Sequence, residues 1–176
     1  MTDLLALDPA IDRDRRLCRA VIETPRGNRT KYKYDNALGG FALSHLLPEG
    51  MIYPLDFGFI PGTCAGDGDA VDVMVLSEEP LIAGLVLEVR LVGVLEANQT
   101  EAGKTVRNDR LLAATRVSRL YAEVREPADI GKSFLESVEA FWVNYNALRG
   151  RRFEPLGTKG AEDAMRLVEQ SRVKGA

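Results

Sequence analysis

The sequence Asp67-Gly68-Asp69-Ala70-Val71-Asp72 runs directly into the apolar stretch Val73-Met74-Val75-Leu76. Three aspartates this close together repel one another, so they remain ionised only where cations neutralise them. Their hard oxygen atoms suit Mg²⁺, Mn²⁺ or Ca²⁺ rather than zinc or copper. Asp72 stands at the mouth of the strand that follows, where alternation fixes the face from which its side chain points. The pattern therefore predicts a divalent metal site beside a β-strand.

Other interpretations of this stretch differ in how well they fit their surroundings. A solvated acidic turn before a strand stays open, because Asp and Gly both favour turns. An EF-hand loop starting at Asp67 would place Val71 and Asp72 where a ligand and a glycine belong. A phosphatase motif of the haloacid-dehalogenase type needs a hydrophobic strand before its first aspartate, whereas Thr63-Cys64-Ala65-Gly66 precedes Asp67. The last two interpretations are therefore not retained.

Length and composition indicate one globular domain over residues 1–176. The chain is 45% hydrophobic, and 176 residues can bury a sizeable core. It contains no apolar run of the about 20 residues that a membrane span needs, and its first residues lack signal-peptide features. Two cysteines are too few for a disulfide framework. A net charge of -3 with mixed signs argues against a nucleic-acid partner. We therefore expect a cytoplasmic protein that binds neither membrane nor nucleic acid.

His45 is the only histidine, which excludes several kinds of active site. A His-rich zinc or iron site cannot be built from one histidine. A Ser-His-Asp triad would have to use His45, yet the chain has no G-x-S-x-G elbow. It also lacks a P-loop and a G-x-G-x-x-G motif after a strand. Metal chemistry with oxygen ligands is the kind of site that remains.

Most of the chain has the pattern of short β-strands separated by Gly, Pro and Asp turns, which is typical of a closed barrel or a sandwich. The last third changes to a helical period, with one broad apolar face over residues 134–148 and a stop at Gly150. A second, weaker helix is expected over residues 161–173. The sequence thus predicts an α+β fold. The expected strands cover residues 17–24, 30–34, 39–47, 51–60, 71–76, 85–95 and 107–114.

With these residues laid out, the chain resembles the soluble family I inorganic pyrophosphatases. The signature D-G-D-x-V-D of that family matches residues 67–72, and further matches follow in family order over about residues 17–155. The resemblance implies an OB-like, five-stranded closed β-barrel with additional strands and two C-terminal helices packed on it. The further matching segments are Val21-Ile22-Glu23-Thr24-Pro25, Lys31-Tyr32, Tyr53-Pro54, residues 57–63, Val92-Gly93-Val94-Leu95 and residues 141–145.

The resemblance also implies roles for the acidic residues. Asp67 and Asp72 match metal ligands, and Glu23 matches an outer carboxylate of the metal site. Asp69 matches the aspartate that deprotonates the attacking water. Mg²⁺ is the implied cofactor, with Mn²⁺ as an alternative, because two such ions can generate hydroxide and clamp the phosphates.

Four further residues are candidates for binding the substrate, pyrophosphate. Lys31 and Tyr145 match a lysine and a tyrosine that contact phosphate. His45 stands where the family has a phosphate-binding arginine, and Arg110 where it has the lysine of a D-x-K segment. These matches predict a phosphate-binding group of side chains.

The second metal segment departs most from the family pattern. Asn108 aligns with an expected bridging carboxylate. A one-residue slip would instead make Asp109 the metal ligand, but strand alternation would turn it to the opposite face. A loop expected over residues 96–103 offers Glu96 and Glu101 as stand-ins for another family aspartate. The register stays open at this point.

Other departures from the family pattern reduce the number of phosphate-binding side chains. Lys33, Phe57 and Asn146 replace a glutamate, a tyrosine and a lysine of the family. These changes leave three functional interpretations: hydrolysis of pyrophosphate, hydrolysis of another phosphoanhydride or an organic diphosphate, and a catalytically weakened metal-binding or scaffold protein. The resemblance further implies a homo-oligomer, most often a hexamer. The apolar segments Leu46-Leu47 and Leu81 to Leu87 are consistent with an interface or with the core.

Overall fold

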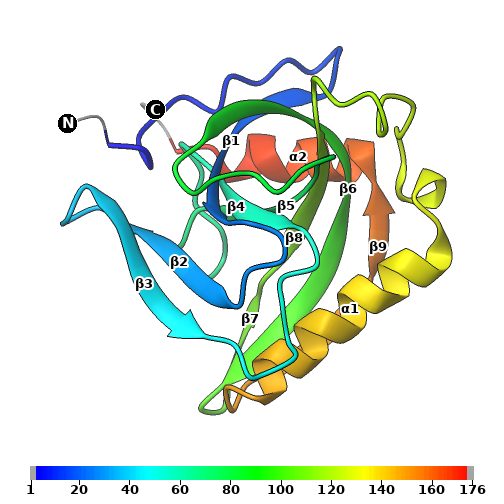
Figure 1. Cartoon of the computed structure of the whole chain (residues 1–176). Helices are drawn as coiled ribbons and strands as arrows, with labels where there is room; N and C mark the ends of the chain where they lie inside the picture. Colours follow the sequence, from blue (N-terminus) through cyan, green and yellow to red (C-terminus); the bar gives the residue numbers. More distant parts are fainter. Residues whose placement is uncertain (1–2, 174–176) are drawn as a thin grey trace.

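The computed structural model describes residues 3–173, and five strands form a closed ring at its centre (Figure 1). The order around the ring is β1-β4-β5-β8-β6, and pairing between β1 and β6 closes it. Strands β5 and β8 run parallel, and the other neighbours run antiparallel. Closure removes the exposed edges of a sheet. The strands are β1 (Leu17–Thr24), β4 (Asp56–Ile60), β5 (Val71–Leu76), β6 (Val86–Glu101) and β8 (Arg110–Thr115). The predicted α+β fold around a five-stranded closed barrel is confirmed.

Strand β5 shows why an uninterrupted apolar run belongs here. Successive side chains of a strand point to opposite faces, and both faces of β5 are covered. Val73 and Val75 pack inside the barrel, whereas Met74 and Leu76 pack in a second core beneath helix α1 (Lys132–Ala147). This second core gathers the aromatic side chains of the predicted helical face, including Trp142.

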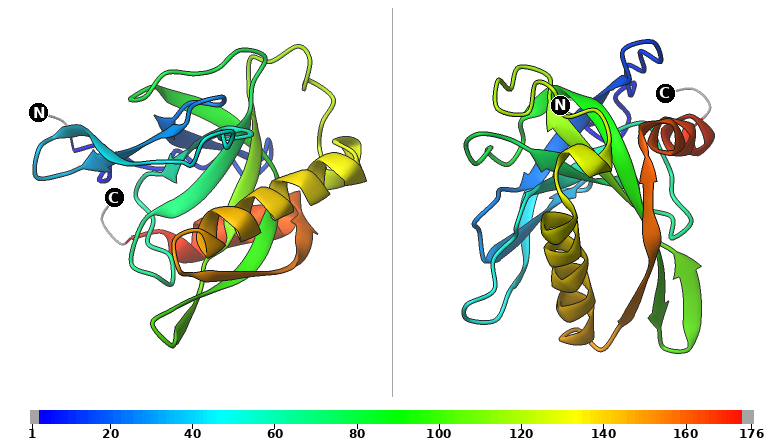
Figure 2. Two further views of the ribbon diagram at one scale, coloured as in Figure 1. Left: turned by 60° about the horizontal axis from the view of Figure 1, so that its bottom comes forward. Right: turned by 90° about the vertical axis from the view of Figure 1, so that its right-hand side faces the viewer.

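Helices and additional strands lie around the barrel (Figure 2). Helix α2 (Ala161–Ser171) packs its buried side chains Ala164, Met165 and Val168 into the barrel core. The hairpin of β2 (Thr30–Asp35) and β3 (Gly40–Leu46) forms a separate sheet. Strands β7 (Lys104–Arg107) and β9 (Arg152–Gly160) pair with the far end of β6, and a 3₁₀ turn (Pro127–Asp129) precedes α1. No helix within residues 3–173 is long and apolar enough to cross a membrane.

Several predicted boundaries were wrong. Residues 96–103 were expected to form a loop, but β6 continues to Glu101 and turns back at Ala102 and Gly103, both with positive φ. Strand β9 was not predicted, because Pro155 and Gly157 weaken a strand pattern. Its only strand partner among the described residues is β6, and this pairing defines it. Only residues 56–60 of the expected strand 51–60 are extended into the sheet. Both predicted helices are present.

Candidate active site

A pocket of about 760 Å³ opens where β1, β2, β5 and β8 meet the end of α1. Its size falls within the usual range of small-molecule sites. The pocket gathers eight of the nine site residues predicted from the sequence; Asp109 is the exception. Those that line it are Glu23, Lys31, His45, Asp67, Asp69, Asp72, Arg110 and Tyr145.

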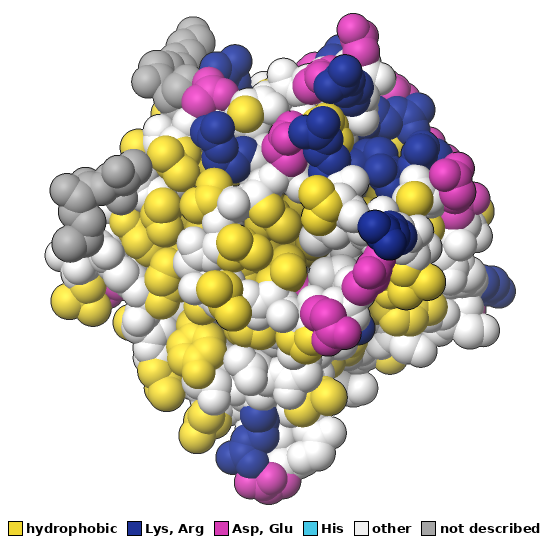
Figure 3. Space-filling model, turned by 45° about the horizontal axis from the view of Figure 1, so that its top comes forward, with side chains coloured by type: hydrophobic (Ala, Val, Ile, Leu, Met, Phe, Trp, Pro, Cys, Tyr) yellow, Lys and Arg dark blue, Asp and Glu magenta, His cyan; other side chains and the backbone are white. Residues whose placement is uncertain are grey.

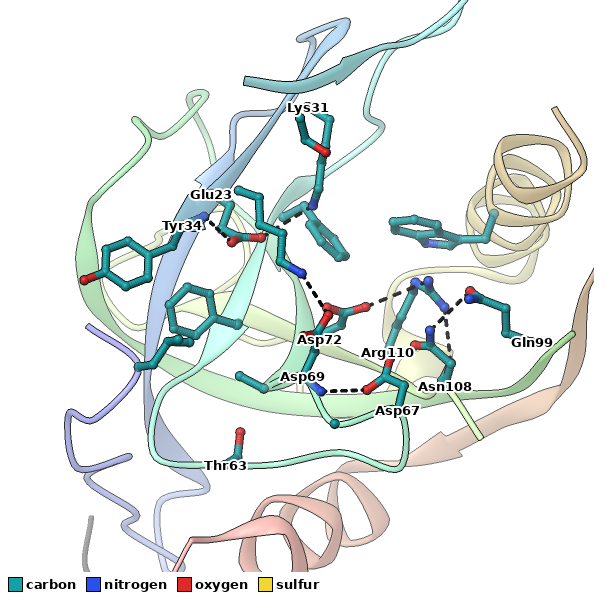
Figure 4. A pocket seen from close by; sticks show the side chains of 18 of the residues that line it. Glu23, Lys31, Tyr34, Thr63, Asp67, Asp69, Asp72, Gln99, Asn108 and Arg110 are labelled. Carbon is teal, nitrogen blue, oxygen red and sulfur yellow. Dashed lines mark hydrogen bonds and ion pairs between the residues drawn. The ribbon is translucent and has the colours of Figure 1, made fainter. Parts of the chain in front are cut away.

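The acidic loop, residues 67–72, forms one wall of the pocket (Figure 4). A turn at Gly68, with φ of 90°, brings the backbone N–H of Asp69 to Asp67 Oδ1 at 3.1 Å. Lys33 Nζ of strand β2 donates to Asp69 Oδ2 at 2.9 Å, although both side chains are more than half exposed. Burial lowers the pKa of Lys33, but the hydrogen bond and charge of Asp69 outweigh it and raise that pKa. The loop thus already has one cation beside it.

Asp72 and Arg110 lie side by side because they are register partners on the parallel strands β5 and β8. Arg110 is 3% exposed, and its guanidinium carbon lies 4.0 Å from the Trp142 ring centroid and 4.5 Å from that of Phe153. One of its nitrogens is 3.8 Å from Asp72 Oδ2. Partial burial in the pocket raises the pKa of Asp72 to about 6, although the charges of Arg110 and Lys31 oppose the change. A cation bound beside Asp72 would lower that pKa and favour the ionised carboxylate.

Glu23 and Lys31 form a second buried ion pair across strands β1 and β2. Lys31 Nζ lies 3.5 Å from Glu23 Oε2, while the other carboxylate oxygen accepts the Tyr34 backbone N–H at 2.7 Å. Lys31 Nζ also lies 4.0 Å from the centroid of the Phe57 ring. Burial lowers the pKa of Lys31, although Glu23 and Asp72 oppose the change. The pair orients one carboxylate and one ammonium toward the pocket.

His45 and Tyr145 meet on another side of the pocket. His45 Nε2 lies 2.9 Å from the Tyr145 hydroxyl, and His45 Nδ1 lies 3.0 Å from Ser44 Oγ. Partial burial lowers the pKa of His45 to about 4, with help from the charges of Arg149 and Lys31. His45 is therefore uncharged at neutral pH, unlike the arginine that the resemblance implies at this position.

The structure places Asn108, and not Asp109, in the pocket. Asn108 Nδ2 donates to Gln99 Oε1 at 3.2 Å, and both residues line the cavity. Asp109 Oδ1 instead accepts the Ala97 N–H at 2.9 Å and Arg107 Nε at 2.5 Å. Asn108 and Asp109 link β7 to β8: Asn108 lines the pocket with Arg110, whereas the hydrogen bonds of Asp109 hold its side chain against Ala97 and Arg107. We therefore leave Asp109 out of the proposed metal ligands.

The donor set fits a divalent cation in its chemistry, although its present arrangement is not that of a finished metal site. Asp67, Asp72 and Glu23 supply hard oxygen donors of the type that Mg²⁺ prefers. Within residues 3–173, no group of three His, Cys, Asp or Glu side chains is already arranged to hold a metal. Instead, Lys31, Lys33 and Arg110 each pair with one carboxylate of the pocket, as Figure 4 illustrates for Glu23, Asp69 and Asp72. A divalent cation would therefore share or compete for these carboxylates with the side-chain cations.

Gln99, Arg149 and Arg151 are polar residues of the pocket that the predicted set did not include. Gln99 lies on the part of β6 that was expected to be a loop, so its position was hidden. Arg149 and Arg151 follow α1 in the run Arg149-Gly150-Arg151-Arg152. This basic run directly after a helix end was the signal that could have identified them.

A barrel whose wall carries clustered carboxylates beside buried lysine and arginine has the features of a metal-dependent hydrolase acting on phosphates. The chain belongs to the inorganic pyrophosphatase family, whose family model matches residues 20–174. An inorganic pyrophosphatase of Thermus thermophilus is 33% identical over 172 residues, covering 98% of this chain and 95% of the relative. The resemblance inferred from the sequence is confirmed.

Solved structures agree with this assignment. The crystal structure of inorganic pyrophosphatase from Thermus thermophilus matches with a TM-score of 0.88 and 31% identity, and the match covers 97% of each chain. The structure of an inorganic pyrophosphatase from Coxiella burnetii matches with a TM-score of 0.85 and 28% identity, over 94% of this chain and 97% of that chain.

Proposed function

We propose that this protein hydrolyses inorganic pyrophosphate to two phosphates with Mg²⁺, Mn²⁺ being an alternative cation. The observation that carries the proposal is the convergence of the acidic loop and Glu23 with two buried cations, Lys31 and Arg110, on one pocket. Carboxylates that bind divalent cations and cations that bind phosphate are both required for this reaction. Family membership supports the same reaction.

The acidic residues have separate roles in this proposal. Asp67, Asp72 and Glu23 would hold Mg²⁺, which supplies a Lewis acid that lowers the pKa of water and neutralises phosphate charge. Asp69 accepts the proton of the attacking water. Lys33 donates a hydrogen bond to Asp69 Oδ2. No other described residue donates to Asp69 Oδ1, so Oδ1 is available to take that proton. Exposure of Asp69 at the pocket wall lets it reach a water molecule.

The basic and phenolic residues bind the phosphates. Lys31 and Arg110 are buried, so their charges are poorly screened by water and act strongly on phosphate oxygens. Tyr145 adds a hydroxyl donor. If Ser44 donates to His45 Nδ1, then His45 Nε2–H donates to the Tyr145 oxygen, and the phenolic hydrogen is left for a phosphate. His45 in this assignment orients Tyr145 without adding charge.

Two other functions compete with this proposal. An organic diphosphate would need apolar surface, but Phe57 is only 4% exposed and Lys31 lies over its ring. A weakened metal-binding or scaffold protein is favoured by Asn108 and Asn146, which stand where the family has charged residues. Calorimetric titration that finds at least two Mg²⁺ or Mn²⁺ sites, tightened by a phosphate analogue, would reject the scaffold.

A substrate comparison tests the proposed reaction. Initial rates of phosphate release are measured for pyrophosphate, tripolyphosphate and ATP at one Mg²⁺ concentration. We expect pyrophosphate to be turned over fastest. A clear preference for either of the other substrates would replace the proposed substrate with a larger phosphoanhydride.

Assembly and location follow from the same resemblance and are part of the proposal. We expect a cytoplasmic homo-oligomer, with a hexamer favoured. Leu47 is core, but Ile82 and Val86 are 69% and 40% exposed and Leu46 is 55% exposed. Figure 3 shows hydrophobic side chains gathered over one face of the molecule. Light scattering that returns a monomer mass at micromolar concentration would reject the oligomer.

A further inference from the structure

The chain reverses direction after α1 in a turn that carries two arginines into the pocket. We refer to residues 146–151 as the arginine turn. The carbonyl of Asn146 accepts the backbone N–H of Arg149 at 2.9 Å and that of Arg151 at 3.0 Å. Gly150, with φ of 71°, adopts the left-handed conformation that lets the chain reverse. Arg149 and Arg151 consequently both line the pocket, next to Tyr145.

Arg149 differs from the other lysine and arginine side chains of the pocket because it has no carboxylate partner among the described residues. Among the described residues it has no carboxylate within 4.0 Å, and its guanidinium carbon lies 5.6 Å from the Tyr145 ring centroid. The other four basic side chains each have an ion-pair partner, so much of their charge is already compensated. These pairs are Lys31–Glu23, Lys33–Asp69, Arg110–Asp72 and Arg151–Glu101. The Tyr145 side of the pocket thus carries an uncompensated positive charge.

Buried polar atoms without hydrogen-bond partners gather in the same pocket. Three such side-chain atoms occur among the described residues, and all three belong to residues that line it. Leaving a buried donor unsatisfied costs free energy, so such atoms mark places where a ligand can bind. Two of the three are donors, which suits a ligand that carries acceptor oxygens. The atoms are Tyr53 Oη, Arg110 Nε and Asn146 Oδ1.

We propose that Arg149 and Arg151 bind one phosphate group of the substrate on the Tyr145 side of the pocket, while the acidic loop serves the other phosphate. The inference rests on the proposed function and adds two substrate-binding residues to it. Guanidinium groups bind phosphate through paired hydrogen bonds, which a lone lysine cannot reproduce. The uncharged His45 beside Tyr145 supplies no charge there, so the arginine turn provides it.

Electrostatics around His45 agree with this placement. After burial, the charges of Arg149, Lys31 and Arg151 are the causes that keep the pKa of His45 near 4. Both arginines of the turn therefore act on the atoms that surround the Tyr145 hydroxyl. Glu101, which pairs with Arg151 Nε at 3.0 Å, holds that guanidinium at the edge of the pocket.

Binding of methylenediphosphonate, a pyrophosphate analogue that is not hydrolysed, tests the inference without turnover. Calorimetry is carried out with Mg²⁺ on the full-length protein and on Arg149→Gln, Arg151→Gln and Arg152→Gln. We expect Kd to rise about tenfold for each of the first two variants, because each loses a charge-assisted hydrogen bond. Arg152 is the matched control: its side chain is 74% exposed and pairs with Glu154 outside the pocket. Its Kd should stay within about twofold of the unsubstituted protein's.

The outcomes separate this inference from the proposed function. Arg149→Gln that binds the diphosphonate as tightly as the unsubstituted protein would overturn the arginine subsite, and so would absence of any diphosphonate binding. Arg149 is exposed and has no carboxylate partner among the described residues, so its substitution should leave folding intact. If Arg151→Gln unfolds, the result for Arg149→Gln decides the test. Arg149→Lys should recover part of the affinity. Failure of the unsubstituted protein to hydrolyse pyrophosphate would instead overturn the function.

Discussion

The acidic loop and the neighbouring segment of Gln99, Asn108 and Arg110 line the same pocket but carry their polarity in different ways. The loop concentrates three carboxylates that depend on cations contributed by other elements or by solvent. In the other segment, a hydrogen bond joins the side-chain amides of Asn108 and Gln99, and the Arg110 guanidinium is buried between aromatic rings. The comparison indicates that the acidic loop is the part of the pocket that needs metal cations, while the other segment supplies a cation of its own, Arg110, which pairs with Asp72 of that loop.

The largest expected effect comes from removing the proposed base in the acidic loop. Asp69→Asn should lower kcat for pyrophosphate by about 10²- to 10⁴-fold, the usual contribution of a positioned general base. Metal affinity should change little, because Asp67 and Asp72 are kept. Steady-state kinetics and calorimetric Mg²⁺ titration measure the two effects separately. Retained turnover would locate the chemistry elsewhere.

Removing a proposed metal ligand should affect binding as well as turnover. Asp72→Asn keeps the shape of the side chain but removes the charge beside Arg110. We expect the Kd for Mg²⁺ to rise by more than about tenfold, since hard divalent cations depend on carboxylate ligands. Asp163→Asn on α2 is an exposed control that should bind Mg²⁺ normally. An unchanged Kd for Mg²⁺ in Asp72→Asn would mean that Asp72 of the acidic loop is not a metal ligand.

Adding a carboxylate to the segment of Gln99, Asn108 and Arg110 would make it more like the acidic loop. Asn108→Asp places a charge in the pocket where the resemblance implies one, so Mg²⁺ should bind about tenfold more tightly. Without metal, the extra charge should lower the melting temperature. Asp109→Asn is the matched control: it removes the charge beside Arg107 but keeps an oxygen that can accept from the Ala97 N–H, and its Mg²⁺ affinity should not change. The reverse result, with Asp109 controlling the affinity, would mean that the register of this segment differs.

The smallest expected effect concerns the uncharged His45. Its pKa of about 4 lies below the ordinary value of about 6.5, so the folded state favours the neutral ring. The stability this gives is fully present above about pH 6.5 and is lost as the pH falls toward 4. The free energy of unfolding relative to His45→Gln should therefore fall by about 1 kcal/mol over that range, a figure reduced for partial exposure. Denaturant titrations of both proteins measure it. A difference that does not vary with pH would mean that His45 is not held neutral.

The sequence predicted the acidic loop and the helical face well because both depend on local spacing. Asp67 and Asp69 lie within one turn, and the apolar side chains of α1 recur at the helical period. The family resemblance then located Glu23 and Lys31, which are far from the loop in sequence. These residues come together in one pocket because the barrel closes. Periodicity alone did not distinguish a closed barrel from a sandwich.

The remaining features depend on long-range pairing. Strand β9 contains Pro155 and Gly157 and is defined by its pairing with β6. The choice between Asn108 and Asp109 depended on the register of β8, which pairing of Asp72 with Arg110 fixes. The basic run of the arginine turn was visible in the sequence, but its position in the pocket follows from the direction in which the chain leaves α1.

The most direct test of the account is the Mg²⁺ dependence of phosphate release from pyrophosphate by the purified protein. Two phosphates should be released per pyrophosphate, at a rate that rises with Mg²⁺ to saturation and falls to background when a chelator removes the cation. Absence of any Mg²⁺-dependent phosphate release would contradict it.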